Sequence, residues 1–155
     1  MIKIIAILSI FFLFLNCGFK PIYKLSESNV SSGNYSVQIT NQVSREIIEE
    51  INNNVFSGTD QEYMVKLDIS EDLTPLIINT NGTIAKYRIE IGLNYELVEI
   101  ASDKVISSGA TRGYAQYDVV ASEISNEDTK KSMTKIATKN ALQLMSSRIQ
   151  SIISK

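Results

Sequence analysis

The alternation of apolar and polar side chains between Thr83 and Ile100 constrains this chain most strongly. One face of this stretch carries only apolar or tyrosine side chains: Tyr87, Ile89, Ile91, Leu93, Tyr95 and Leu97. The positions between them carry mostly charged or amide side chains: Lys86, Arg88, Glu90, Asn94 and Glu96. A period of two residues over this length predicts a long β-strand with one buried and one solvated face. The fold must therefore contain a sheet with one face covered.

The next residues predict an antiparallel return strand. The sequence ASDK at 101–104 is a turn, and residues 105–117 follow as the partner strand. Pairing Ile100 with Val105 would place Leu93 opposite Arg112, which is unfavourable on a buried face. A bulge near Gly109 or Gly113 would relieve this conflict, so the sequence leaves the register open.

Extended segments also precede the long strand. They are predicted at residues 35–40, 62–70 and 73–79. The acidic pair Glu71–Asp72 reads as a break between the last two. Pro75 cannot donate to a sheet ladder, so its segment is expected at an edge or a bulge. The sequence NTNG at 79–82 predicts a hairpin turn.

Two amphipathic helices complete the pattern. The first has apolar residues four apart at Val43, Ile47, Ile51 and Val55, and Thr40 or Asn41 is expected to cap its start. The second is expected from about Glu127 to Ser154, capped by Ser125 or Asn126. Its predicted buried stripe is Met133, Ile136, Ala137, Asn140, Ala141, Leu144, Met145, Ile149, Ile152 and Ile153.

Together these elements predict an α+β fold. Each helix has one apolar stripe, so both can cover the same face of the sheet. We expect a two-layer sandwich of two helices packed on one face of a mostly antiparallel four-stranded sheet. A single domain is expected over residues 35–155.

The N-terminal residues have the pattern of a lipoprotein signal. Lys3 precedes an apolar run from Ile4 to Leu15, which is too short to span a membrane. The only cysteine, Cys17, follows directly, so residues 1–16 are predicted to be a signal peptide and Cys17 an acylated first residue. The residues before it, Phe14 to Asn16, depart from the usual small-residue pattern, and the alternative is an ordinary secreted protein with a lone cysteine. Residues 17–34 are expected to form the lipidated N-terminus and a flexible tether; the alternative is a loop packed on the domain.

Composition argues against several classes of function. Removal of residues 1–16 takes away Lys3 and leaves 14 basic against 17 acidic residues, a net charge of −3, which is no footprint for nucleic acid. The chain has no histidine, the commonest metal ligand and general base, and its serines therefore lack the usual activating partner. We expect a non-enzyme without metal or cofactor.

Several segments resemble the LPS-assembly lipoprotein (LptE) family of the alphaproteobacterial type. CGFKPIY, from Cys17 to Tyr23, is similar to the mature start of these proteins. KYRIEIGLNYELVE, VISSGATRGYAQYDVVAS and LQLMSSRIQSIIS resemble the family's central strand, returning strand and final helix, in matching order, with Arg148 at the position of a family arginine. The sequence departs from the family at Asn16, at AQYD and in its small number of arginines.

This resemblance implies a role in outer-membrane assembly. Members are lipid-anchored in the outer membrane, face the periplasm, and plug the lumen of the LptD β-barrel, which inserts lipopolysaccharide into the outer leaflet. The implied partners are an LptD-type barrel, lipopolysaccharide and the membrane. A pilot or accessory lipoprotein of another secretion or transport complex is the alternative, and a lipid-anchored solute-binding or enzyme domain is a third.

Three cations near the long hairpin are candidate ligand contacts. Lys86, Arg88 and Arg112 could bind lipopolysaccharide phosphates through charge-assisted hydrogen bonds. The competing interpretation is that they are ordinary solvated charges on the polar face of the sheet.

Overall fold

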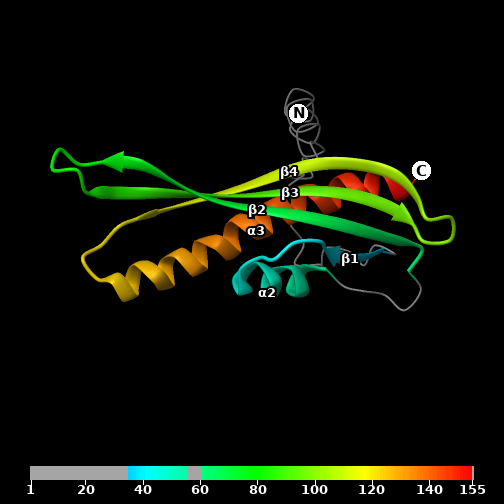
Figure 1. Ribbon diagram of the computed structural model, residues 1–155, viewed down its shortest axis with the longest axis horizontal. Coiled ribbons are helices and arrows are strands. Elements are labelled where there is room, and N and C mark those ends of the chain that lie inside the picture. The colour runs from blue at the N-terminus through cyan, green and yellow to red at the C-terminus, as the bar shows by residue number, and fades with distance from the viewer. Residues whose placement is uncertain (1–34, 56–60, 155) are drawn as a thin grey trace, which may run out of the picture.

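The computed structural model describes residues 35–55 and 61–154, which form one sheet and two helices (Figure 1). In chain order, the elements are β1 (Tyr35–Ile39), α2 (Arg45–Asn54), β2 (Tyr63–Ile78), β3 (Ile84–Glu99), β4 (Lys104–Asp118) and α3 (Glu123–Ile153). The sheet order is β1-β2-β3-β4. Cys17 and the predicted tether lie outside the described residues.

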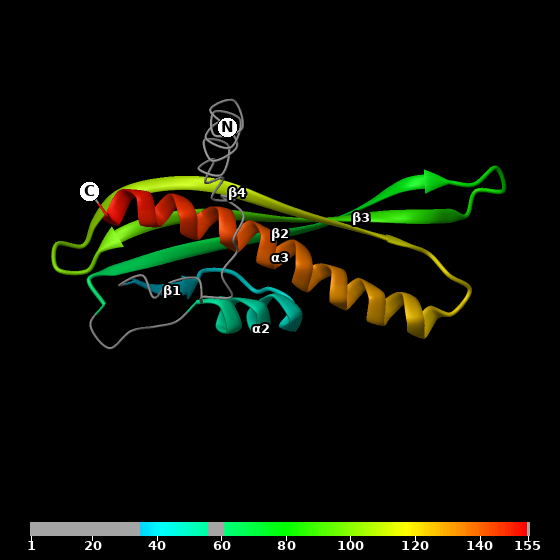
Figure 2. The ribbon, with the colours of Figure 1, turned by 180° about the vertical axis from the view of Figure 1, so that it is seen from behind.

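The sheet is mostly antiparallel, as the sequence predicts. β2, β3 and β4 pair antiparallel, whereas the short β1 pairs parallel to β2, with Tyr35 opposite Tyr63. The expected hairpin turn joins β2 to β3: Gly82 adopts φ +83° and its N–H donates to the Asn79 carbonyl at 2.9 Å. Both helices cover the same face of the sheet (Figures 1 and 2). The predicted two-layer α+β fold is confirmed.

The predicted break at Glu71–Asp72 is wrong, because β2 runs through it without interruption. β1 ends at Ile39 opposite Leu67, so β2 is an outer strand among the described residues from there on. The acidic side chains therefore reach solvent without leaving the strand. Pro75 lies on this outer stretch beside a register shift, which confirms its predicted place.

The register of β3 and β4 keeps Arg112 off the buried face. Leu93 lies opposite Thr111, and the register shifts between Leu97 and Val98, where Ile106 is the extra residue. The irregularity is thus closer to the turn than the predicted sites at Gly109 or Gly113. Thr111 is buried, and its hydroxyl donates to the Ala141 carbonyl at 3.1 Å.

The helix starts differ from their predicted positions. α2 begins after Ser44; Thr40 and Asn41, the predicted caps, bond instead to the backbone of β2 at Leu67 and Ile69. α3 begins four residues before Glu127, and the Ser122 hydroxyl accepts from the Ser125 N–H at 3.3 Å. The Asn126 side chain bonds both N and O of Val120. Thr40, Asn41 and Asn126 thus use their side chains to bond neighbouring strands or loops, and the helices begin at other residues.

The buried face of α3 includes Ala137, Ala141, Met145 and Ile149 of the predicted stripe, but it turns away from Ile136, Asn140 and Leu144. Its buried residues are Thr134, Ala137, Thr138, Ala141, Leu142, Met145, Ser146 and Ile149. Ile136 and Leu144 are 44% and 51% exposed. A Cβ at Gly113 would collide with the Ala137 carbonyl and lie 2.6 Å from the Ala141 nitrogen, so the helix approaches β4 through its small residues.

The exposed side of α3 runs along the outer edge of β4. The Asn140 amide donates to the Tyr114 carbonyl at 3.3 Å, and Arg148 donates to the Ala110 carbonyl at 2.7 Å. Asn140 and Arg148 are eight residues apart on the helix, a rise of about 12 Å, and Tyr114 and Ala110 are four residues apart on the strand, about 13 Å, so the two spacings match. The two side chains protect part of an edge strand from pairing with another chain.

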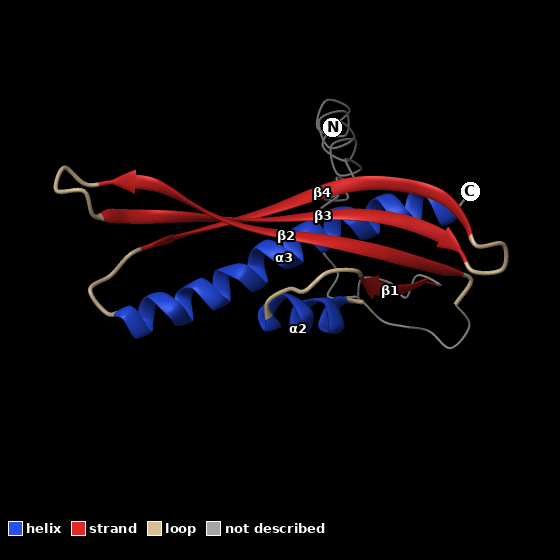
Figure 3. Ribbon diagram, viewed as in Figure 1, coloured by secondary structure: helices blue, strands red, loops and turns tan. Residues whose placement is uncertain are grey.

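The core lies under α2 and the C-terminal part of α3. It contains Ile47 and Ile51 of α2, the apolar face of β3, and Leu142, Met145 and Ile149 of α3. At the other end of the molecule, the β2–β3 hairpin and the first turns of α3 diverge (Figures 1 and 3). Core packing therefore fixes one end and leaves the two long projections at the other end more exposed.

Candidate functional site

The face of the sheet opposite the helices is polar. Residues directly opposite each other in the register share a face, and on this face Lys66 pairs with Glu96, Asp68 with Asn94, and Asp72 with Glu90. Neither α2 nor α3 covers it; this face is turned toward the viewer in Figure 1, where the strands pass in front of α3. We call it the open face. It is a surface suited to a wet, polar environment.

Lys86, Arg88 and Arg112 all lie on the open face. Lys86 Nζ lies 3.1 Å from Asp118 Oδ1, and Arg112 Nη1 lies 3.3 Å from Glu90 Oε1. Both pairs are at least partly solvated, so each contributes little to stability. The three predicted ligand contacts share one face, but two of them already have acidic partners.

Arg88 has the most distinctive environment of the three. Its guanidinium carbon lies 5.8 Å from the centre of the Tyr114 ring, within range of a cation–π interaction. Its Nε is buried and has no hydrogen-bond partner among the described residues. Arg88 therefore keeps hydrogen-bonding capacity that the protein does not use.

The strand spacing separates the cations into two groups. Lys86 and Arg88 are two residues apart on β3, about 7 Å along the strand. Arg112 lies opposite Gly92, six residues from Lys86, or about 20 Å. Glu90 lies between the groups on the same face. One phosphate could contact Lys86 and Arg88 together, but not all three cations.

Sequence reasoning missed the partners of these cations. The alternation in β4 puts Arg112, Tyr114 and Gln116 on one face, but their relation to Arg88 depends on the register, which the Ile106 bulge sets. Tyr114 is 46% exposed.

The outer part of the β2–β3 hairpin is uncharged, and its β2 strand exposes apolar side chains ahead of the polar turn. No charged residue occurs from 73 to 85. Leu73, Leu76, Ile77 and Ile78 are 39–63% exposed. This tip extends beyond the helical layer (Figure 3). An exposed apolar patch of this kind is typical of an interaction surface.

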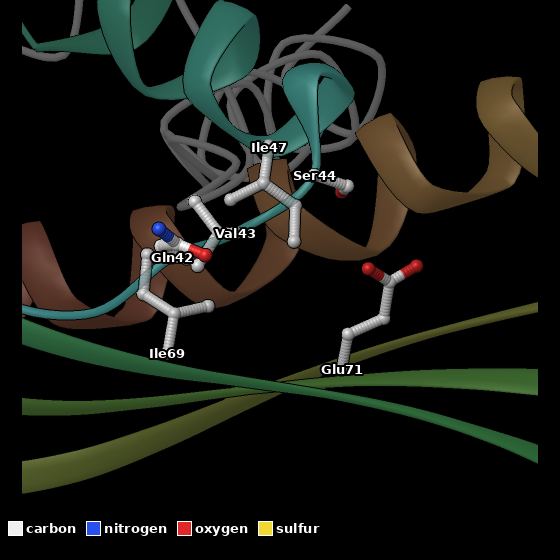
Figure 4. Close-up of a pocket in the computed structure, with 6 residues that line it drawn as sticks. All are labelled: Gln42, Val43, Ser44, Ile47, Ile69 and Glu71. Carbon is white, nitrogen blue, oxygen red and sulfur yellow. The ribbon is translucent and has the colours of Figure 1, made fainter.

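A hollow of about 350 Å³ lies between β2 and the start of α2 (Figure 4). Its lining residues are Gln42, Val43, Ser44, Ile47, Ile69 and Glu71. The Ser44 hydroxyl oxygen is buried without a hydrogen-bond partner among the described residues. Sequence reasoning did not predict this hollow, because it lies between segments about 27 residues apart.

Groups with shifted pKa values lie on the helical side, away from the cations. Hydrogen bonds from Lys135 and Arg45 lower the pKa of Glu49, and the same bond with Glu49 raises the pKa of Lys135. Burial raises the pKa of Tyr35 and of Tyr117. Glu49 thus links α2 to α3.

The described part of the chain offers no metal-binding cluster of three or more suitable side chains. Within the same residues, no helix has the length and apolar character needed to cross a membrane.

Solved structures with this fold come from bacterial lipoproteins. A candidate lipoprotein from Caulobacter crescentus CB15 is similar with a TM-score of 0.62 at 10% identity, covering 78% of this chain and 90% of that one. Lipoprotein B from Nitrosomonas europaea has a TM-score of 0.59 at 12% identity, covering 77% and 83%. Rare lipoprotein B from Shewanella oneidensis has a TM-score of 0.50 at 15% identity, covering 77% and 98%.

No protein-family model and no curated protein sequence matches this chain. At these identities, the structural likeness establishes a shared fold. The described domain therefore has the fold of these lipoprotein structures.

Proposed function

We propose that this chain is an outer-membrane lipoprotein that plugs and supports an LptD-type β-barrel during lipopolysaccharide assembly. It is anchored through Cys17, faces the periplasm, and acts by binding rather than by catalysis. Lipid chains on the Cys17 thiol and N-terminus would hold it stably, since two or more chains give firm membrane attachment.

The observation that carries this proposal is the combination of fold and N-terminal motif. The domain shares its fold with several lipoproteins, including a rare lipoprotein B. The motif CGFKPIY and three later segments resemble the LptE family in matching order. Fold and sequence pattern point to the same class independently.

The open face supports the plug role on physical grounds. The lumen of a large outer-membrane barrel is polar and water-filled, so a plug needs a polar surface. A sheet face that carries charges, amides and hydroxyls meets that need, and two of its cations are paired with acidic side chains.

Lys86 and Arg88 are the proposed contacts for lipid phosphates. Of the three cations, Arg88 is the one without an acidic partner among the described residues, and Lys86 lies close enough to bind the same group. Arg112 is held by Glu90 and is farther away, so we assign it a smaller part.

The test is affinity purification of the tagged protein from detergent-extracted membranes, followed by mass spectrometry. A large β-barrel recovered in roughly equal amount is the expected result. A secretin or an inner-membrane transporter in its place would assign the chain to the pilot class. Recovery of the chain alone, under conditions that keep other barrels intact, would count against the plug role.

A further inference from the structure

One stretch of β2 has hydrogen-bonding groups that the described residues leave unused. Thr40 N–H donates to the Leu67 carbonyl at 2.9 Å, so Leu67 directs its carbonyl away from β3. Backbone groups alternate along a strand, so Ile69, Glu71 and Leu73 direct theirs outward as well. Pro75 is the next residue at an outward-directed position, and it has no N–H.

Asn41 already acts as a short substitute for a neighbouring strand. Its amide nitrogen donates to the Ile69 carbonyl at 2.7 Å, and its oxygen accepts from the Ile69 N–H at 3.2 Å. No hydrogen bond of this kind reaches Glu71 or Leu73 from elsewhere in residues 35–55 and 61–154. The stretch of the β2 edge between Ile69, which Asn41 already bonds, and Pro75 can therefore pair with a short added strand.

The hollow lies beside this edge and has both apolar and polar walls. Figure 4 shows the Glu71 side chain extending from β2 toward the start of α2, where Ser44 lies. Val43, Ile47 and Ile69 supply apolar walls. Among the described residues, one Glu71 oxygen has a hydrogen bond, a long one of 3.4 Å from the Thr134 hydroxyl. The buried Ser44 hydroxyl is free to accept or donate.

We propose that this edge and hollow bind an extended, lysine-bearing segment of a partner protein by strand addition. A residue paired with Glu71 would share its face and so direct its side chain toward the hollow. A lysine stem can pack on apolar walls while its ammonium reaches a carboxylate and a hydroxyl. The inference goes beyond the proposed function, because it holds whichever protein the partner is.

Charge favours such a segment over a second copy of this chain. In a symmetric antiparallel pair centred on this edge at Glu71, the Glu71 carboxylate would lie opposite its own copy, and like charges directly opposite are destabilising. A basic segment meets the carboxylates of Glu71 and Asp72 as attractive partners.

The test uses the full mature chain and a synthetic probe, acetyl-Val-Lys-Val-Lys-Val-amide, followed by amide NMR. Binding should shift the amides of Glu71 and Leu73 and slow their hydrogen exchange. Norleucine in place of lysine keeps the stem and removes the charge, so it should weaken binding about tenfold. A glutamate probe should not bind.

Two variants distinguish the contribution of backbone pairing to probe binding from that of the acidic side chains. Leu73→Pro removes one outward N–H, as Pro75 does naturally, and should weaken probe binding about fivefold relative to Leu73→Ala. The combined change Glu71→Lys and Asp72→Lys should reverse the preference toward the glutamate probe. Spectra of each variant without probe would verify that the fold is retained.

Four outcomes would overturn the proposal. Equal binding by Leu73→Pro and Leu73→Ala, or no change at Glu71 and Leu73, would exclude strand addition. Slow exchange of these amides without probe would show that this chain's own residues occupy the edge. Protection that increases with protein concentration would identify a second copy as the occupant.

Discussion

Close contact at Gly113 determines how α3 sits on the sheet. The small residues Ala137 and Ala141 let the helix backbone approach β4 where no Cβ intervenes. An apolar-stripe argument could not find this, because it ranks Ile136 and Leu144 above alanine and threonine. The packing instead places Ala137 and Ala141 against Gly113, beside the larger buried side chains of Leu142, Met145 and Ile149.

Gly113→Ala should therefore destabilise the domain by about 3 kcal/mol, since overpacking forces helix and strand apart. The matched control is Gly92→Ala, whose Cβ would meet only the Ser70 side chain at 2.5 Å, which can rotate away. Urea unfolding of both variants checks this. Equal losses of stability would contradict the close-packing explanation.

Arg88 and Lys86 carry the residue-scale prediction for ligand binding. Lys86→Ala with Arg88→Ala should weaken lipopolysaccharide binding by about tenfold or more, because two charge-assisted contacts are lost. Arg112→Ala should have a much smaller effect, because Arg112 is paired with Glu90 and its backbone position is about 20 Å along the strand from Lys86. Binding to immobilised lipopolysaccharide measures both. A larger loss with Arg112→Ala would move the site along the open face.

At the scale of elements, sequence periodicity located the strands and both helices within the described residues, although it divided β2 into two segments. It could not place their ends, because Thr40, Asn41 and Asn126 form side-chain bonds to other segments in place of the predicted caps. It also could not set the β3–β4 register, since Ile106 and Val105 have similar β-propensity and either could be the extra residue. The open-face partners of Arg88 and Arg112 depend on that register.

Two serine substitutions at the start of α3 compare the observed N-cap, Ser122, with a predicted N-cap, Ser125. Ser122→Ala should cost about 1 kcal/mol of stability, because its hydroxyl accepts the Ser125 N–H. Ser125→Ala, which alters a predicted cap, should change stability by only a few tenths of a kcal/mol, within the ordinary range for surface changes. Thermal unfolding of both proteins would reveal the difference. The reverse order would mean that the helix starts near Glu127.

The ion pair between α2 and α3 gives a pH prediction. The Lys135 and Arg45 bonds lower the pKa of Glu49 from 4.5, so its contribution is present above that value and is lost as pH falls through the lowered pKa. The stability difference between the native chain and Lys135→Ala should be constant at neutral pH and shrink below about pH 4.5. Urea unfolding across pH 3–7 checks it. A difference that persists at pH 3 would show that lost packing, not charge, is responsible.

At the scale of the whole molecule, the protein has a packed end and an open end. α2 and the C-terminal part of α3 cover the core, whereas the β2–β3 tip and the first turns of α3 diverge (Figures 1 and 2). Ile77, Ile78 and Ile124 are 49%, 63% and 79% exposed in this region. Under the plug proposal, this end and the open face meet the barrel, whereas the packed end maintains the fold.

The most direct test of the plug proposal is site-specific photo-crosslinking in intact cells, with a photoreactive residue at Asn94 on the open face. Ser147, which is exposed on α3, provides a second position that maps the opposite side. The account predicts that Asn94 crosslinks to lumen-facing positions of a single outer-membrane barrel. Crosslinks only to soluble periplasmic proteins, or to an inner-membrane transporter, would contradict the plug role.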